Sequence, residues 1–143
     1  MNKRIVLSKT PRQTENIAGD IAELIRMGGT VALYGELGSG KTTFAKGLAK
    51  KLGVKERIIS PTFLIIRVHR TIEERSFYHI DLYRISKKED LDSLGLEEIL
   101  SNEGNIVVIE WAEKIIQLLP EKRIDVHFEY KSENERMIEV NAK

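Results

Sequence analysis

Cysteine is absent from the 143-residue sequence, and several other features are scarce. Without a thiol the chain cannot form disulfides, thiolate metal sites or iron–sulfur clusters, and it has no cysteine nucleophile. Three prolines and ten glycines are too few for a low-complexity protein. No apolar run approaches the ~18 residues of a membrane-spanning helix, and residues 5–7 are too short a run for the core of a signal peptide. We therefore expect a globular, cytoplasmic protein that does not associate with membranes.

No charge of one sign dominates, because 23 lysines and arginines face 22 aspartates and glutamates, a net charge of +1. An independent nucleic-acid binder of high affinity normally has a strongly basic face, so the balance argues against that class, although it is compatible with a local basic patch. The length corresponds to one domain with one hydrophobic core. We expect residues 1–143 to fold as a single domain.

Helix-like and strand-like segments alternate along the chain, which predicts an α/β fold. The apolar run 106–109 is typical of a strand buried on both faces. The polar connection 70–75 favours an antiparallel hairpin around it. We expect a mostly parallel central sheet with an antiparallel portion, flanked by helices. The predicted strands are 4–7, 30–34, 63–68, 76–83, 106–109, 124–130 and 137–140, and the predicted helices are 11–27, 41–52 and 87–100, the last broken near Gly95.

Residues 35–42 match the phosphate-loop pattern G-x-x-x-x-G-K-[S/T] at every fixed position. The match lies between a predicted strand and a predicted helix, which is the context that this motif requires. Glycines let backbone N–H groups approach phosphate oxygens, and the helix N-terminus adds its dipole. We expect Lys41 to bind the β- and γ-phosphates and the Thr42 hydroxyl to ligate Mg²⁺. The predicted nucleotide-binding residues are Gly35, Gly38, Ser39, Gly40, Lys41, Thr42 and Thr43.

P-loop enzymes also need an acid, usually at the end of a buried strand, to hold Mg²⁺ or its water. Glu110 directly follows the apolar run 106–109, so it is the predicted metal residue. The role of Asp81 is less well determined by the sequence. The alternation of side chains along a strand places it with His79 and Tyr83 on one face. That face is compatible with either a solvated surface or the wall of a site.

Two further residues have more than one interpretation. Thr62 lies where P-loop proteins carry a segment that senses the γ-phosphate, but its hydroxyl also suits an ordinary turn. Trp111 follows Glu110 directly, and a single tryptophan beside a metal site fits core packing, an exposed contact or a moving element.

Five segments occur in an order that resembles the TsaE family, the small bacterial P-loop ATPases of threonylcarbamoyladenosine tRNA modification. The resemblance runs from about Thr10 to Pro120, and the later segments are more specific than the phosphate loop alone. The segments are GELGSGKTTF (35–44), SPTF (60–63), YHIDLYR (78–84), LGLEE (94–98) and IEWAEK (109–114).

The resemblance implies a single-domain P-loop NTPase fold that binds ATP and Mg²⁺. It also implies a partnership with the TsaB–TsaD complex, which modifies tRNA. The protein would then interact with tRNA only indirectly, through that complex. ATP hydrolysis would then support repeated turnover of the complex. By the same resemblance Lys41, Asp81 and Glu110 are catalytic, Thr42 and Glu110 hold Mg²⁺, Thr62 is a switch residue, and Trp111 is a conformational or partner contact.

The expected mechanism is in-line attack of water on the γ-phosphate, with either Asp81 or Glu110 positioning the water. Arg84 is a candidate arginine finger. A finger from a partner can add ~10³–10⁵-fold to the rate, so we expect a Mg-dependent ATPase that is weak alone and stimulated by its partners. One alternative is a small P-loop metabolite kinase, although the segment 70–75 is too short and too acidic for the arginine-bearing lid that such kinases usually need. The other is a nucleotide-gated binding module that does not hydrolyse ATP.

Overall fold

The computed structural model describes residues 2–58 and 65–143. Strands and helices alternate through most of this part of the chain. The strands are β1 (Asn2–Ser8), β2 (Gly29–Tyr34), β3 (Ile66–Arg70), β4 (Ser76–Asp81), β5 (Ile106–Glu110), β6 (Ile124–Tyr130) and β7 (Arg136–Ala142). The helices are α1 (Pro11–Ala22), α2 (Lys41–Lys51), α3 (Lys88–Asp92), α4 (Leu96–Ser101) and the 3₁₀ helix η1 (Ala112–Leu118).

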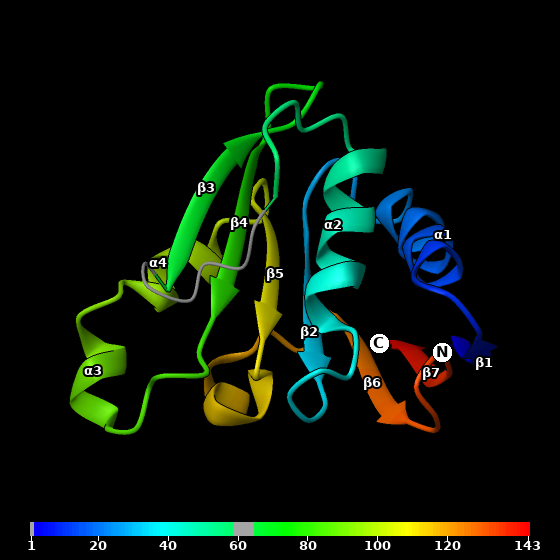
Figure 1. Ribbon diagram of the computed structural model, residues 1–143. Coiled ribbons are helices and arrows are strands. Elements are labelled where there is room, and N and C mark those ends of the chain that lie inside the picture. Colours follow the sequence, from blue (N-terminus) through cyan, green and yellow to red (C-terminus); the bar gives the residue numbers. More distant parts are fainter. Residues whose placement is uncertain (1, 59–64) are drawn as a thin grey trace.

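The strands form one seven-stranded mixed sheet in the order β1-β7-β6-β2-β5-β4-β3. The central strands β6, β2, β5 and β4 run parallel to one another, and their arrowheads point the same way in Figure 1. β3 is antiparallel to β4 at one edge, while β7 and β1 extend the other edge in antiparallel pairs. The predicted α/β class, with parallel and antiparallel portions, is confirmed. The carboxyl ends of β2, β4 and β5 consequently meet at one edge, where α/β proteins place their ligands.

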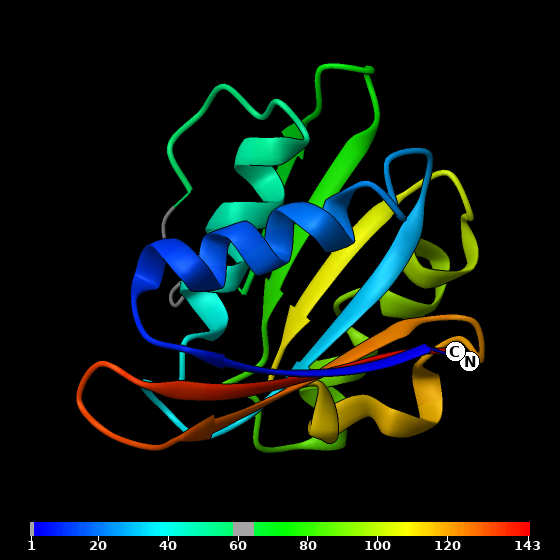
Figure 2. The same cartoon turned by 90° about the vertical axis from the view of Figure 1, so that its right-hand side faces the viewer.

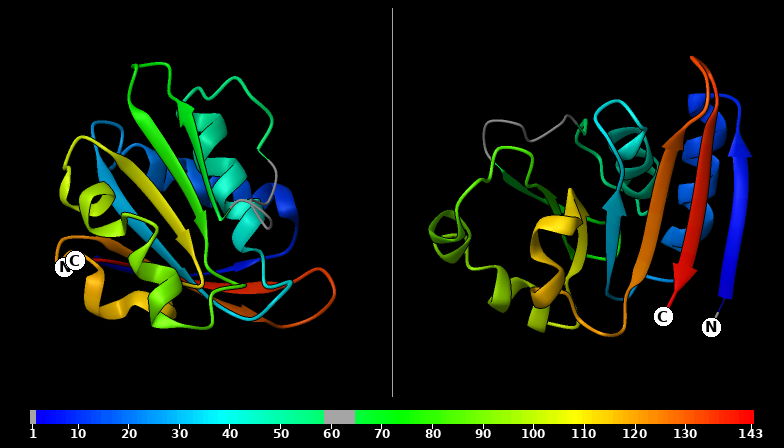
Figure 3. Two further views of the ribbon diagram at one scale, coloured as in Figure 1. Left: turned by 90° about the vertical axis from the view of Figure 1, so that its left-hand side faces the viewer. Right: turned by 90° about the horizontal axis from the view of Figure 1, so that it is seen from below.

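Helices cover both faces of the sheet (Figures 1 and 2). α1 and α2 pack against one face around the fully buried Phe44 and Leu48, and η1 and α4 cover the other around Ile115. Every residue of β5 is buried, which explains the unbroken apolar run 106–109 that precedes Glu110. The two ends of the chain lie side by side because β1 pairs with β7 (Figure 3).

α1 and α2 approach each other closely at Gly47. A Cβ built on Gly47 would lie 2.7 Å from both the Cα and the carbonyl oxygen of Glu15 in α1. A glycine at this position therefore permits the contact that brings α2 down onto the sheet, with its N-terminus at the carboxyl edge.

Several element boundaries differ from the prediction. α1 ends at Ala22 instead of reaching Gly28, because the chain continues in turns that begin with a hydrogen bond from Leu24 N to the carbonyl of Ile21, 2.9 Å long. The predicted strand 63–68 corresponds to β3, which covers Ile66–Arg70, and residues 63 and 64 lie outside the described residues. The break near Gly95 is confirmed, since its φ of 68° separates α3 from α4.

The 3₁₀ helix η1 was not predicted, and it begins immediately after β5. In residues 2–58 and 65–143, no helix has both the length and the apolar character that crossing a bilayer requires.

Candidate functional site

The loop between β2 and α2 has the geometry of an anion site. Gly35, Gly38 and Gly40 all have positive φ angles, of 152°, 77° and 109°, which favour glycine. α2 starts at Lys41 without a side-chain hydrogen bond to cap it, so the N–H groups of its first turn point to the loop uncapped. Within the described part of the chain the buried hydroxyl of Ser39 also lacks a partner. Together these groups suit phosphate oxygens.

Lys41 is buried at the base of this loop, with 4% of its surface exposed. Its Nζ donates hydrogen bonds to the carbonyl oxygen of Gly35 and, at 2.9 Å, to that of Glu36. The same Nζ lies 3.9 Å from the centroid of the Trp111 ring. Burial lowers the pKa of Lys41, and nearby carboxylates, Glu110 first, oppose that shift. The ammonium group therefore sits in the loop, on partners that phosphate oxygens can replace.

Thr42 and Glu110 meet across the junction of α2 and β5. The Thr42 hydroxyl lies 3.0 Å from Oε1 and 3.2 Å from Oε2 of the Glu110 carboxylate, to which it donates. A hydroxyl and a carboxylate are the hard oxygen ligands that Mg²⁺ prefers, and Mg²⁺ usually takes one or two protein ligands together with substrate phosphates. No cluster of three or more histidines and carboxylates suited to a metal occurs in the part of the chain that the structure describes. The donor set fits a magnesium ion that is shared with a bound nucleotide.

Asp81 ends β4 directly opposite Glu110 in the register of β4 and β5. Its side chain is buried, and its Oδ1 accepts a hydrogen bond of 3.0 Å from the backbone N–H of Tyr83. The solvated interpretation is therefore wrong for Asp81, whereas Tyr83, which follows β4, is exposed. Arg84 is exposed nearby in the chain, and Thr62 lies outside the described residues.

Trp111 has a left-handed backbone, with φ of 63°, and it joins β5 to η1. Its half-buried ring packs against Lys41 and, at 5.3 Å between centroids, against Tyr83. The structure thus places Trp111 in the wall of the site. Its contact with Lys41 was not predicted from the sequence.

His79 is a site residue that the sequence analysis left without a role. Its fully buried ring places Nε2 2.6 Å from Oε2 of Glu110. The alternation of β4 had put His79 on the face of Asp81, but the contact requires that β4 and β5 be neighbours, and the sequence did not establish the strand order.

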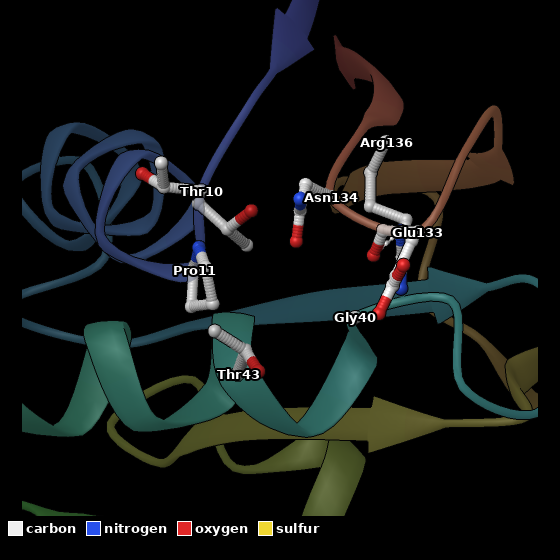
Figure 4. A pocket seen from close by; sticks show the side chains of 8 residues that line it. Thr10, Pro11, Gly40, Thr43, Glu133, Asn134 and Arg136 are labelled. Carbon is white, nitrogen blue, oxygen red and sulfur yellow. Dashed lines mark hydrogen bonds between the residues drawn. The ribbon is translucent and has the colours of Figure 1, made fainter.

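A small cavity of about 90 Å³ opens beside the phosphate loop (Figure 4). Thr43 of α2, the start of α1 and the turn between β6 and β7 contribute its walls, and Asn134 points into it. Arg136 fixes that turn to the loop, because its Nη2 donates to the carbonyl oxygen of Gly38 at 3.2 Å. The sequence analysis predicted a helix that starts at Pro11, but it did not predict this cavity. Its lining residues are Thr10, Pro11, Thr14, Gly40, Thr43, Glu133, Asn134 and Arg136.

A phosphate loop between β2 and α2, with a carboxylate at the end of the adjacent parallel strand, defines a P-loop protein of the α/β class. Comparison with known proteins narrows this class. The family model described as "Threonylcarbamoyl adenosine biosynthesis protein TsaE" matches residues 8–138, and the chain belongs to the TsaE family.

Relatives and a solved structure agree with this assignment. The TsaE protein of Rickettsia bellii, named for tRNA threonylcarbamoyladenosine biosynthesis, is 36% identical over 98% of this chain and 95% of its own length. The Bacillus subtilis protein of the same name is also 36% identical, over 92% of this chain and 81% of its own. The crystal structure of Bacillus subtilis YdiB superimposes with a TM-score of 0.80 and 32% identity, covering 99% of this chain and 86% of that one.

Proposed function

We propose that this protein binds ATP and Mg²⁺ at its phosphate loop and hydrolyses ATP in support of tRNA threonylcarbamoyladenosine biosynthesis, together with a TsaB–TsaD complex. The relatives named for that pathway support the biological role. The observation that carries the chemistry is the junction of Lys41, Thr42 and Glu110 at the carboxyl edge of the sheet. A cation, a hydroxyl and a carboxylate at that junction are the groups that phosphoryl-transfer sites use.

The position of the cavity supports one orientation of the nucleotide in the site. In phosphate loops the lysine serves the β- and γ-phosphates, so the terminal phosphate belongs beside Lys41 and Glu110. Thr43, which follows Thr42 in the first turn of α2, lines the cavity. We assign the sugar and base to this cavity and the α-phosphate to its border at Thr43. The turn anchored by Arg136 then closes the side of the site away from Glu110.

The side chains divide the chemistry among themselves. When the nucleotide binds, the ammonium group of Lys41 leaves the carbonyl oxygens of Gly35 and Glu36 and binds the charged phosphate oxygens instead. Thr42 and Glu110 would hold Mg²⁺, which when bound neutralises charge on the phosphate oxygens. A carboxylate at the end of β4 or β5, Asp81 or Glu110, accepts a hydrogen bond from the attacking water and thereby orients it.

We assign a conformational role to Trp111. Phosphate oxygens that draw Lys41 toward them remove the cation from the Trp111 ring, which lies 3.9 Å away. Trp111 immediately precedes η1, so a change in its packing reaches the surface formed by η1 and Tyr83. Through this surface the protein would communicate its nucleotide state to a partner. Thr62 remains a proposed sensor of the γ-phosphate.

The test is the release of inorganic phosphate from ATP by the purified protein, alone and with TsaB–TsaD and tRNA. We expect slow release alone and faster release with the partners, since a partner can supply an arginine finger worth ~10³–10⁵-fold. Lys41→Ala should abolish release in both conditions. Lys46→Ala is the matched control, because Lys46 is an exposed lysine of the same helix.

Two other results would overturn the proposal in different ways. Transfer of the phosphoryl group to a small metabolite instead of water would identify a kinase. Tight ATP binding without phosphate release, even with the partners present, would identify a nucleotide-gated binding module.

A further inference from the structure

His79 contacts the predicted magnesium residue from inside the sheet. Its side chain has no exposed surface, and its Nε2 lies 2.6 Å from Oε2 of Glu110, whose own side chain is 4% exposed. So short a distance is typical of a charge-assisted hydrogen bond. The Thr42 hydroxyl approaches the same carboxylate and lies nearer to its other oxygen, Oε1, at 3.0 Å. Glu110 is therefore held between a histidine and the phosphate-loop hydroxyl.

Strand register produces this contact. β4 and β5 are parallel neighbours in which His79 pairs with Val108 and Asp81 pairs with Glu110. Residues paired in register share a face of the sheet, so all four side chains point the same way. His79 reaches Glu110 diagonally, two positions along the neighbouring strand, which is within the range of a long side chain.

The bonding of the ring shows what the histidine contributes. A carboxylate only accepts hydrogen bonds, so Nε2 carries the ring proton and donates a hydrogen bond to Glu110. The other ring nitrogen, Nδ1, is buried and has no partner among residues 2–58 and 65–143. A buried polar atom without a partner costs free energy, so an apolar side chain of similar shape would fill this space at less cost. What an apolar side chain cannot supply is the hydrogen bond to Glu110.

We propose that His79 is a positioning residue of the magnesium site: its Nε2–H fixes Oε2 of Glu110, so that Oε1, the oxygen nearer to Thr42, would be available to a divalent cation. This inference rests on the proposed function, because it presupposes that Mg²⁺ and nucleotide bind at this loop. Groups that orient a metal ligand through a hydrogen bond typically contribute 10–100-fold to metal affinity or activity. We expect an effect of that size in the dependence on Mg²⁺, with little effect on nucleotide binding in the absence of the ion.

The experiment compares three variants of the full chain. His79→Gln keeps an N–H donor near the position of Nε2, whereas His79→Asn carries the same amide on a side chain one carbon shorter. His69→Asn is the matched control, since His69 is also a buried histidine of the sheet, with Nδ1 3.0 Å from a carboxylate oxygen of Glu56. The affinity for a fluorescent ATP analogue is measured at increasing Mg²⁺ concentrations, and the readout is the concentration at which half of the ion's effect is reached. Titrations in EDTA give the affinity without the ion, and melting curves give the stability of each variant.

We expect His79→Asn to raise the half-saturating Mg²⁺ concentration about 10–100-fold, with affinity in EDTA within about threefold of the unmodified protein. His79→Gln should restore most of the loss. His69→Asn should lower the melting temperature without changing the Mg²⁺ dependence. If His79→Asn only lowers the melting temperature, as His69→Asn does, then His79 is a packing residue and the inference is wrong. An unmodified protein that binds no nucleotide, with or without Mg²⁺, contradicts the proposed function instead.

A measurement on the unmodified protein covers the case in which His79→Asn does not fold. The chain has three histidines, so the ¹⁵N spectrum of its ring nitrogens is simple to assign. We expect the Nε2–H of His79 to remain protonated and hydrogen-bonded after ATP and Mg²⁺ are added. Loss of that hydrogen bond when the ion binds would overturn the proposal.

Discussion

The ammonium group of Lys41 lies against the face of Trp111, with Nζ 3.9 Å from the centroid of the ring. A contact of this kind is worth about 0.5–2 kcal/mol, more where water is excluded. The ammonium is also held by two backbone carbonyls of its own loop. The phosphate loop, the end of β5 and the start of η1 are therefore connected through one side chain.

This connection predicts that ATP binding changes the fluorescence of the protein. Trp111 is the single tryptophan of the sequence, so tryptophan emission reports the surroundings of this one residue. Phosphates that draw Lys41 away remove a cation from the indole face, and we expect a saturable change in emission when ATP and Mg²⁺ are titrated. The midpoint should equal the dissociation constant from calorimetry. Unchanged emission, with binding seen by calorimetry, would show that Lys41 and Trp111 stay together.

Lys41 should lower the stability of the protein while it enables binding. Burial lowers the pKa of Lys41, so folding disfavours its charged form. This cost is present in full below the lowered pKa, and it disappears as the pH rises from there toward the unfolded value of ~10.4. We expect Lys41→Met to have a higher free energy of unfolding than the unmodified protein at pH 7, by urea denaturation without nucleotide. The difference should narrow as the pH rises from the lowered pKa of Lys41 toward the unfolded value. A gap that is constant with pH would contradict this account of the charge.

Two helical glycines should respond to alanine in opposite directions. At Gly19 a new Cβ would have no neighbour closer than 3.9 Å, so Gly19→Ala should stabilise the protein by about 0.4–1 kcal/mol. At Gly47 the Cβ would lie 2.7 Å from the backbone of Glu15, so Gly47→Ala should destabilise it by about 1–3 kcal/mol. Urea denaturation of both variants measures the two signs. Equal effects would mean that α1 and α2 are not packed as described.

Filling the cavity beside Thr43 should weaken binding of the sugar and base but not binding of the phosphates. Asn134 points into this cavity from the turn between β6 and β7 (Figure 4). We expect Asn134→Trp to weaken ATP binding about tenfold, equivalent to about 1.4 kcal/mol, by occupying the space assigned to the sugar and base. Inorganic tripolyphosphate, which has neither, should bind with unchanged affinity in calorimetry. Equal losses for both ligands would place the base elsewhere.

Much of this site could be predicted from local sequence. The phosphate-loop pattern carries its own geometry, because glycines at fixed spacing permit the positive φ angles that the structure shows at Gly35, Gly38 and Gly40. Glu110 could be predicted as well, since an acid after a fully buried strand has to emerge at the edge of the sheet. Both depend on a few consecutive residues.

The remaining features depend on the order of the strands. The contact of His79 with Glu110 exists because β4 lies beside β5, and no local pattern specifies that neighbour. The cavity likewise joins the start of α1 to the turn between β6 and β7, which are more than 120 residues apart in the chain. The contact of Trp111 with Lys41 depends on a left-handed residue that is not glycine, for which the sequence carries no signal.

We propose that ATP hydrolysis at this loop sustains repeated tRNA modification. The most direct measurement is the amount of threonylcarbamoyladenosine formed per TsaD when TsaB–TsaD is limiting and tRNA, ATP and the threonylcarbamoyl donor are in excess. With the unmodified protein we predict many rounds of modification, and with Lys41→Ala a halt after the first round. Continued rounds with Lys41→Ala, at the rate of the unmodified protein, would contradict the claim.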